Sequence, residues 1–303
     1  MTRPKRGFKN GLKWWWQTRV SAWWKVWLPA RIKAVNARQA PIAFTRRAAP
    51  LPDGCPDDNS VTAILTVYKR SHYLSQQVDA LRKQTVPPTE IWVWCNDNEA
   101  DAQDVSDLVD RVIVSNANWK FWGRFSLATM ARTRWICLLD DDILPEPNWL
   151  SHCLDTWRAG YEGILGGSGV ILPKEKRYSS KHKVGWNGHH YDAPAEVDLV
   201  GHAWFFHRDH LHYLWREEPI SWENGEDIHF SAMALKHGNI KTYVPAHPES
   251  DTACWSCRPD FGKMAGRTRT ATHNTAGHGS TRDKVVSSLR DGGWQILADR
   301  ESQ

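Results

Sequence analysis

The chain has 303 residues, of which 41% are hydrophobic and 24% charged, enough to bury one large core or two small ones. Six cysteines in a chain of this length exclude a disulfide scaffold and favour a reducing compartment. The net charge is +5, but residues 1–52 contain twelve Lys or Arg and no Asp or Glu, so the rest of the chain is net acidic. This asymmetry predicts a basic arm that serves an anionic surface and is attached to a separate folded body.

The basic arm carries a helical pattern over residues 12–33, where apolar positions at helical spacing alternate with Lys and Arg. Because tryptophan favours the lipid headgroup boundary and basic side chains favour an anionic leaflet, we expect a cytoplasmic protein held peripherally at a membrane surface. No apolar run is long enough to span a bilayer, and Lys25 interrupts any signal-peptide core. Two alternatives stay open, a helix packed on its own domain and a nucleic-acid arm. No nucleic acid is expected as a partner. A proline-rich linker follows.

Strands and helices then alternate. The patterns predict strands at residues 61–67, 90–95, 112–114 and 135–139 and helices around residues 74–81, 105–109 and 125–133. Such alternation predicts a parallel α/β sheet with ligands gathered at the carboxyl ends of its strands. Three polar segments follow predicted strands: Tyr68-Lys69-Arg70, Asn96-Asp97-Asn98 and Asp140-Asp141-Asp142.

The alternation loosens beyond residue 157. The sequence predicts a strand at residues 164–172, a basic and His-rich loop at 174–191, a strand pair at 197–206, a helix that opens at Glu226-Asp227, a strand at 240–244 and a short helix around 285–289. We expect residues 53–257 to form the catalytic domain and residues 258–303 to form a C-terminal loop and helix that close on the site.

The acidic triplet implies a cation. Side chains alternate along an extended chain, so Asp140 and Asp142 point to one side and Asp141 to the other. Three carboxylates at the end of a buried strand repel one another unless they are protonated, paired with Arg or Lys, or neutralised by a divalent metal. An all-oxygen site suits Mg²⁺ or Mn²⁺. The alternative is a solvated acidic turn, but the apolar strand before the triplet and the Pro-x-Pro helix start after it favour a metal site.

In this order and at these intervals, the segments resemble the GT-A glycosyltransferases, most closely family 2, with some likeness to the exostosin type. The segments that carry the resemblance are Thr66-Val67-Tyr68-Lys69-Arg70 for the first-strand nucleotide motif, Gln84-Thr85 with Glu90-Ile91-Trp92-Val93 for the segment after it, Gly123-Arg124-Phe125 for an exostosin-type Arg-Phe segment, Leu139-Asp140-Asp141-Asp142 for the metal motif, and Gly225-Glu226-Asp227 for the acidic motif that supplies the base in inverting members. The resemblance implies a GT-A (Rossmann-like) mixed, mainly parallel sheet flanked by helices.

The resemblance also implies roles for single residues. Donor binding falls to Tyr68, Arg70, Asn96, Asp97, Arg124, Asp140 and Asp141, metal binding to Asp140, Asp142 and His247, and catalysis to Asp227 as base with Glu226 beside it. His273 and His278 are rivals of His247 for the third metal position. Many family 2 members carry an acidic residue where this chain has Cys95-Asn96, so Asn96 or Asp97 must bind the nucleotide base.

The function implied is Mn²⁺- or Mg²⁺-dependent transfer of a sugar from a nucleotide-diphosphate donor to a glycan or lipid-linked acceptor. The Gln-x-x-Arg-Trp pattern of processive synthases is missing, which favours addition of one sugar at a time, and inversion is favoured over the retaining, exostosin-like alternative. Two rivals compete. A nucleotidyltransferase would share Lys69 but needs a glycine-rich phosphate loop, which the sequence lacks. A non-catalytic binding protein leaves the ordered acidic motifs unexplained.

Overall fold

The computed structural model describes residues 58–97, 106–174, 177–265 and 277–300. The helix predicted over residues 12–33 lies outside these ranges. The described residues belong to a single compact unit, Leu51–Gln303. None of the helices in these ranges is long and apolar enough to cross a membrane.

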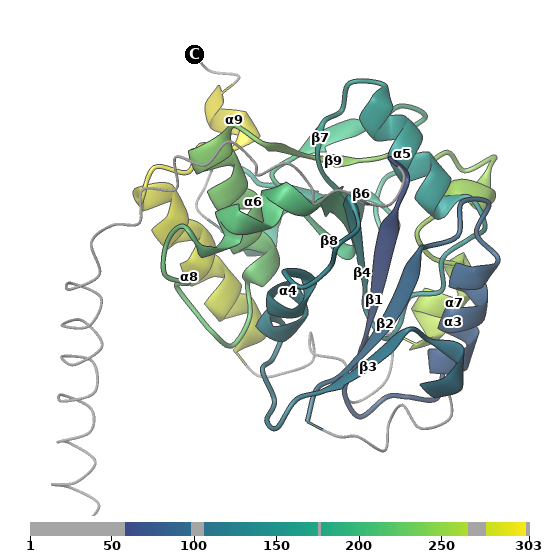
Figure 1. The fold of residues 1–303 in the computed structure, drawn as a ribbon. Helices are drawn as coiled ribbons and strands as arrows, with labels where there is room; N and C mark the ends of the chain where they lie inside the picture. The colour runs from purple at the N-terminus through teal and green to yellow at the C-terminus, as the bar shows by residue number, and fades with distance from the viewer. Residues whose placement is uncertain (1–57, 98–105, 175–176, 266–276, 301–303) are drawn as a thin grey trace, which may run out of the picture. The chain divides into compact units, whose positions relative to one another are not determined.

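A mixed, mainly parallel sheet runs through the described residues (Figure 1). Its strands are β1 (Val61–Val67), β2 (Glu90–Cys95), β3 (Arg111–Val114), β4 (Trp135–Leu139), β5 (Gly163–Ile171), β6 (His182–Gly185), β7 (Ala195–Val197), β8 (Leu199–His207) and β9 (Lys241–Val244). The order is β3-β2-β1-β4-β8-β5-β9-β7, and β6 pairs with β5 outside this path. The pairs β3-β2, β2-β1, β1-β4 and β5-β9 are parallel, whereas β8 runs antiparallel to both neighbours. This confirms the predicted fold class.

Helices cover both faces of the sheet (Figure 1). They are α3 (Leu74–Arg82), α4 (Trp122–Ala128), α5 (Trp149–Arg158), α6 (Glu226–Gly238), α7 (Pro259–Ala265), α8 (His278–Asp291) and α9 (Leu297–Arg300), with 3₁₀ turns η3 (Tyr178–Ser180), η4 (Arg208–Trp215) and η5 (Thr252–Cys254). Because strand side chains alternate, β1 buries Ala63 and Leu65 against α3, α5 and α7, and Ile64 against α4 and α6. The two apolar cores therefore lie on opposite faces of the same strands.

The sheet register brings separate polar segments to one edge. Strands β1, β2 and β4 run in parallel, so the residues that follow them, Tyr68, Asn96 and Asp140, lie at the same end of the sheet. Strand β8 is antiparallel to β4 and pairs Ala203 with Leu139, which places His202 beside Asp140 at that edge. Strand order alone thus assembles a polar site from four distant segments.

Helix α6 begins at the same edge because Gly225 allows a sharp entry. Gly225 has φ of 93°, and a Cβ there would lie 3.2 Å from a methyl group of Val285 on α8. Helix α8 packs on α6 through an apolar cluster that includes Ile228, Met233 and Val286. The two helices therefore hold each other in place beside the sheet edge.

Several element predictions need correction. Residues 174–191 contain strand β6 and not only a loop, because residues 182–185 pair with β5. In place of the helix predicted around 105–109, residues 106–108 form a short 3₁₀ turn. Residues 109 and 110 form a bend. The last predicted helix, at 285–289, is the longer α8, and α4 starts and ends earlier than predicted.

Candidate active site

A cavity of about 550 Å³ opens at the carboxyl edge of the sheet. Its lining residues are Thr66, Tyr68, Arg70, Asn96, Asn118, Lys120, Phe121, Arg124, Asp140, Asp141, Asp142, Gly201, His202, Trp204, Glu223, Asn224, Glu226, Asp227, Gly277, His278, Thr281 and Arg282. They come from the ends of β1, β2 and β4, from β8 and α4, and from the starts of α6 and α8. The cavity thus joins both acidic segments identified in the sequence.

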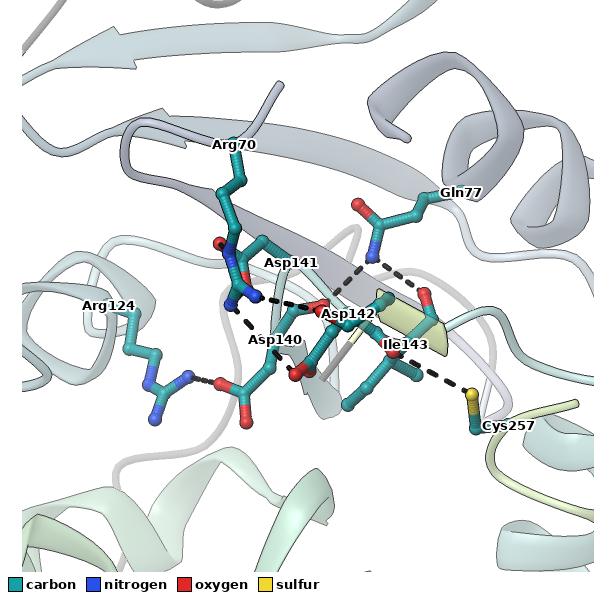
Figure 2. A network of polar contacts seen from close by, with 9 residues as sticks. Arg70, Gln77, Arg124, Asp140, Asp141, Asp142, Ile143 and Cys257 are labelled. Carbon is teal, nitrogen blue, oxygen red and sulfur yellow. Dashed lines mark hydrogen bonds and ion pairs between the residues drawn. The ribbon is translucent and has the colours of Figure 1, made fainter. Parts of the chain in front are cut away.

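The acidic triplet is held by two arginines (Figure 2). Arg70 binds Asp141 through both Nε, at 2.7 Å from Oδ2, and Nη2. Arg124 binds Asp140 through Nη1. Asp142 is paired less closely, since its Oδ2 lies 3.9 Å from Nη2 of Arg70. The triplet is therefore only partly neutralised by the protein.

The turn that presents the triplet is fixed through its backbone (Figure 2). The buried Gln77 of α3 donates from Nε2 to the carbonyl oxygens of Asp140, at 2.8 Å, and Ile143, at 2.7 Å. Cys257 accepts a hydrogen bond from the backbone N–H of Leu144 at 3.3 Å. These contacts leave the three carboxylates free to face the cavity while the chain that carries them is held.

Charge crowding changes the protonation of the triplet. Burial, followed by the negative charges of Asp140 and Asp141, raises the pKa of Asp142 to about 7. Burial also raises the pKa of Asp141, although Arg70 opposes that shift. A cation bound at Asp142 would offset the repulsion from Asp140 and Asp141 and lower the pKa of Asp142 again. The region is thus electrostatically suited to bind positive charge.

Arg124 connects the triplet to the acidic pair at the start of α6. Its side chain is 2% exposed, its Nη2 donates to Oε1 of Glu226 at 3.0 Å, and its guanidinium lies 4.3 Å from the ring centroid of Trp204. Burial lowers the pKa of Arg124, but the charges of Asp140 and Glu226 outweigh burial and raise it overall. Arg124 therefore stays charged and fastens α6 to β4.

The two carboxylates at the start of α6 have different surroundings. Burial, followed by the charge of Asp227, raises the pKa of Glu226 to about 7, against the opposing effect of Arg124. Asp227 accepts hydrogen bonds from the backbone N–H of Ile228, at 2.8 Å, and from Nη2 of Arg282. Each carboxylate thus pairs with a different arginine, although Arg124 is shared with Asp140.

The segment after β2 is built around Asn96. Its Nδ2 donates to Oδ1 of Asn118 at 2.9 Å, and its Oδ1 accepts from the backbone N–H of Trp119 at 2.8 Å. Asp97, with φ of 86°, is exposed and does not line the cavity. Of the two residues predicted to face the nucleotide base, the structure brings Asn96 to the cavity.

The histidines predicted as metal ligands are dispersed. His247 does not line the cavity: its ring lies 4.2 Å from that of Trp255, and its Nδ1 is 2.8 Å from Nδ1 of His190. His278 does line the cavity, and His273 lies outside the described residues. Across the described ranges, no group of three or more His, Cys, Asp or Glu side chains is arranged to hold a metal ion. The structure brings Asp140 and Asp142 together without His247.

Several residues that line the cavity were not identified from the sequence, among them one arginine, one histidine, one asparagine and one lysine. Arg282 comes from α8 and His202 from β8, while Asn118 and Lys120 precede α4. Burial lowers the pKa of His202 to about 4, and its ring stacks 4.2 Å from that of Trp186. The register of β8 against β4 is the only signal that could have placed His202, and it depends on tertiary structure.

A comparison with protein families identifies the family to which the chain belongs. Residues 62–215, about half of the chain, match glycosyl transferase family 2. The chain belongs to this family and carries a glycosyltransferase domain with the GT-A fold. The crystal structure of S. aureus TarS is similar with a TM-score of 0.46 and 15% identity, over 62% of this chain and 35% of that chain. The chain thus aligns with about a third of the length of TarS. A comparison with curated proteins returned no match.

The role of Arg124 in holding the site can be tested by its removal. We expect Arg124→Met to lower the free energy of unfolding by about 3–5 kcal/mol, because a buried carboxylate loses its ion-pair partner. Denaturant unfolding measures this change. The double variant Arg124→Met with Glu226→Gln should recover part of the loss, since the uncompensated charge is gone. A single variant as stable as the unaltered protein would contradict the role given to Arg124.

Proposed function

We propose that the chain is a non-processive, inverting glycosyltransferase that uses Mg²⁺ or Mn²⁺ and moves a sugar from a nucleotide-diphosphate donor to a glycan or lipid-linked acceptor. One observation carries this proposal. A single cavity is lined both by the acidic triplet after β4 and by the acidic pair that opens α6. A transferase of this kind needs a site for the diphosphate and a separate base for the acceptor hydroxyl.

The donor is assigned to the side of the cavity formed by β1 and β2. Tyr68 and Asn96 line this side and are proposed to contact the nucleoside, whereas Asp97 is exposed and does not line the cavity. Arg70 and Arg124 are proposed to assist at the phosphates, because a guanidinium can bind two oxygens at once. Both arginines are paired with the triplet, so the donor would meet charges that are already oriented.

Asp140 and Asp142 are proposed to hold the metal, and Asp141 to hold Arg70 in place. Mg²⁺ is usually bound by one or two carboxylates together with phosphate oxygens and water, so two aspartates without a third protein ligand fit such an ion. The incomplete pairing of Asp142 supports the same assignment. Bound there, the ion would neutralise charge that builds on the departing diphosphate.

Asp227 is proposed as the general base, with Glu226 as its neighbour in the acidic motif. An acceptor hydroxyl must lose its proton as the new bond to the sugar forms, and a carboxylate within hydrogen-bond reach can take that proton. Asp227 lines the cavity and has its two oxygens fixed by Ile228 and Arg282. Glu226 is paired with Arg124 and so supports the structure of the site.

The metal assignment predicts a specific loss in Asp142→Asn. With Mn²⁺ and a panel of nucleoside diphosphates and nucleotide sugars, the unaltered protein should be stabilised by about 2.7 kcal/mol when the ligand is at a hundred times its Kd. Asp142→Asn should stay folded and lose both this stabilisation and transfer, whereas Asp79→Asn, on the exposed surface of α3, should keep both. Thermal shift measures the stabilisation by ligand, and mass spectrometry of the products measures sugar transfer. Full metal-dependent activity in Asp142→Asn would refute the assignment.

The assignment of the base makes a separate prediction. Asp227→Asn should bind nucleoside diphosphate and Mn²⁺ nearly as the unaltered protein does, while turnover falls by about a hundredfold or more. NMR of the anomeric proton in the first product should show a configuration opposite to that of the donor. A retained configuration would mean that the retaining, exostosin-like alternative holds and that Asp227 has another role.

The basic arm is proposed to hold the enzyme at an anionic membrane surface through residues 12–33. Deletion of residues 1–40 should release the protein from anionic vesicles in a sedimentation assay, because those residues carry the basic charge and many of the tryptophans. Transfer to a soluble acceptor should continue, since the acidic motifs remain. Loss of folding or of donor binding on truncation would instead support a helix packed on its own domain.

A further inference from the structure

We propose that Arg282 of helix α8 is a positioning residue for sugar transfer, which keeps the carboxylate of Asp227 ionised and aimed into the cavity. The inference rests on the proposed function, in which Asp227 is the general base. It assigns a role in the reaction to α8, because Arg282 lies on this helix and not on the sheet or on α6. The experiment below separates the failure of this inference from the failure of the proposed function.

The contact between the two side chains is direct and shielded from solvent. Nη2 of Arg282 donates to Oδ2 of Asp227, and the side chains are 8% and 11% exposed, respectively. The other carboxylate oxygen, Oδ1, accepts from the backbone N–H of Ile228 at 2.8 Å. With both oxygens held, the plane of the carboxylate is fixed. A carboxylate has about four lone-pair sites, so sites stay available for an incoming hydroxyl.

The position of Arg282 depends on few other polar contacts. The guanidinium lies 4.3 Å from the ring centroid of Tyr178, which covers one of its faces. Its Nε is buried and has no hydrogen-bond partner among the described residues. Among the described residues, Asp227 is also the one carboxylate that forms an ion pair with Arg282. Burying a guanidinium is costly, and here the compensating charge is that of Asp227.

The neighbour of Asp227 explains why such a cation is needed. Glu226 and Asp227 are both buried and adjacent at the start of α6, and the charge of Asp227 disfavours the ionised form of Glu226. Glu226 is compensated by Arg124, which is already shared with Asp140. Without Arg282, Glu226 and Asp227 would take up a shared proton already at a higher pH. Asp227 could then no longer accept the proton of the acceptor hydroxyl.

Other charges around Asp227 do not replace Arg282. The titratable and charged groups that act on it directly or through a partner are Glu226 of α6, Arg282 of α8, Arg124 of α4, and Tyr178 and Lys181 at η3. On strand β8, a Cβ added at the uncharged Gly201 would lie 3.7 Å from Oδ2 of Asp227, and His202 of the same strand lines the cavity with a pKa that burial lowers to about 4. Lys181 has its pKa lowered by burial, and its Nζ lies 4.0 Å from the ring centroid of Tyr178. Arg282 is thus the cation in contact with Asp227.

The test compares Arg282→Met with Arg282→Lys. A general base must be ionised, so activity falls as the pH drops through the range in which the base takes up a proton. Removing an adjacent cation favours the protonated form, so this fall should move to higher pH by about 1 to 3 pH units in Arg282→Met. Arg282→Lys keeps the charge and should restore most of the original profile. The pH dependence of kcat/KM is measured with the donor that the nucleotide-sugar panel identifies.

A second measurement needs no activity. The side-chain carboxyl carbon of Asp227 can be followed by ¹³C NMR and assigned through its absence in Asp227→Asn. Its titration should move to higher pH in Arg282→Met, and in Arg282→Gln, which retains a hydrogen-bond donor and provides a neutral variant if the methionine variant does not fold. Because no substrate is used, this result is independent of the reaction assigned to the enzyme.

Arg290→Met is the matched control. Arg290 is a second arginine of α8, with 9% exposure and an ion pair to Asp299 at 3.0 Å, but it does not line the cavity. Its loss should lower the stability of the fold without moving the pH dependence of kcat/KM or the NMR titration of Asp227. An unchanged NMR titration in both neutral variants of Arg282 would overturn the inference. A shifted NMR titration with an unchanged pH profile of activity would uphold the effect of Arg282 on Asp227 and show that Asp227 is not the base.

Discussion

The compensation of buried negative charge is the constraint on which this site depends. Six carboxylates line one cavity, and three arginines from separate parts of the chain bind four of them: Arg70 after β1, Arg124 on α4 and Arg282 on α8. An unpaired buried carboxylate costs several kcal/mol, so these pairs decide which elements can approach the sheet edge. Arg124 has the central place, because it bridges the carboxylates of β4 and α6. Its stack against Trp204 connects the same bridge to β8.

The compensation is uneven, and this gives the cavity two different ends. At the triplet, Asp142 lies 3.9 Å from its cationic partner Arg70, and burial with its acidic neighbours raises its pKa. At the start of α6, each carboxylate has an arginine within hydrogen-bond distance. The first end gains from an added cation and from the phosphates such a cation brings, while the carboxylates at the second end are paired with arginines and can act on a neutral hydroxyl. This difference suits a reaction in which the leaving group is charged and the acceptor is not.

Local sequence patterns predicted the frame of this site but not the side chain that pairs with its proposed base. The strands at residues 61–67 and 90–95 have the predicted bounds because β-branched and apolar runs decide them locally, and the triplet was found because it follows such a run. Arg282 was not found, because its partner is 55 residues away and only the packing of α8 on α6 joins them. His247 illustrates the same limit. Its position between two prolines gives no indication of the stack with Trp255 that the fold provides.

The closure by α8 ties the proposed chemistry to the stability of the fold. Val285 and Val286 of α8 pack on α6 near Gly225, and this apolar contact is what brings Arg282 to Asp227. The ion pair and the helix packing therefore support each other, so changes at Arg282 affect both the fold and the state of the carboxylate. The situation at Asp142 differs, since burial and the charges of Asp140 and Asp141 disfavour its ionised form and raise its pKa to about 7. A carboxylate with such a raised pKa at the edge of the cavity is expected where ligand binding, and not folding, requires it.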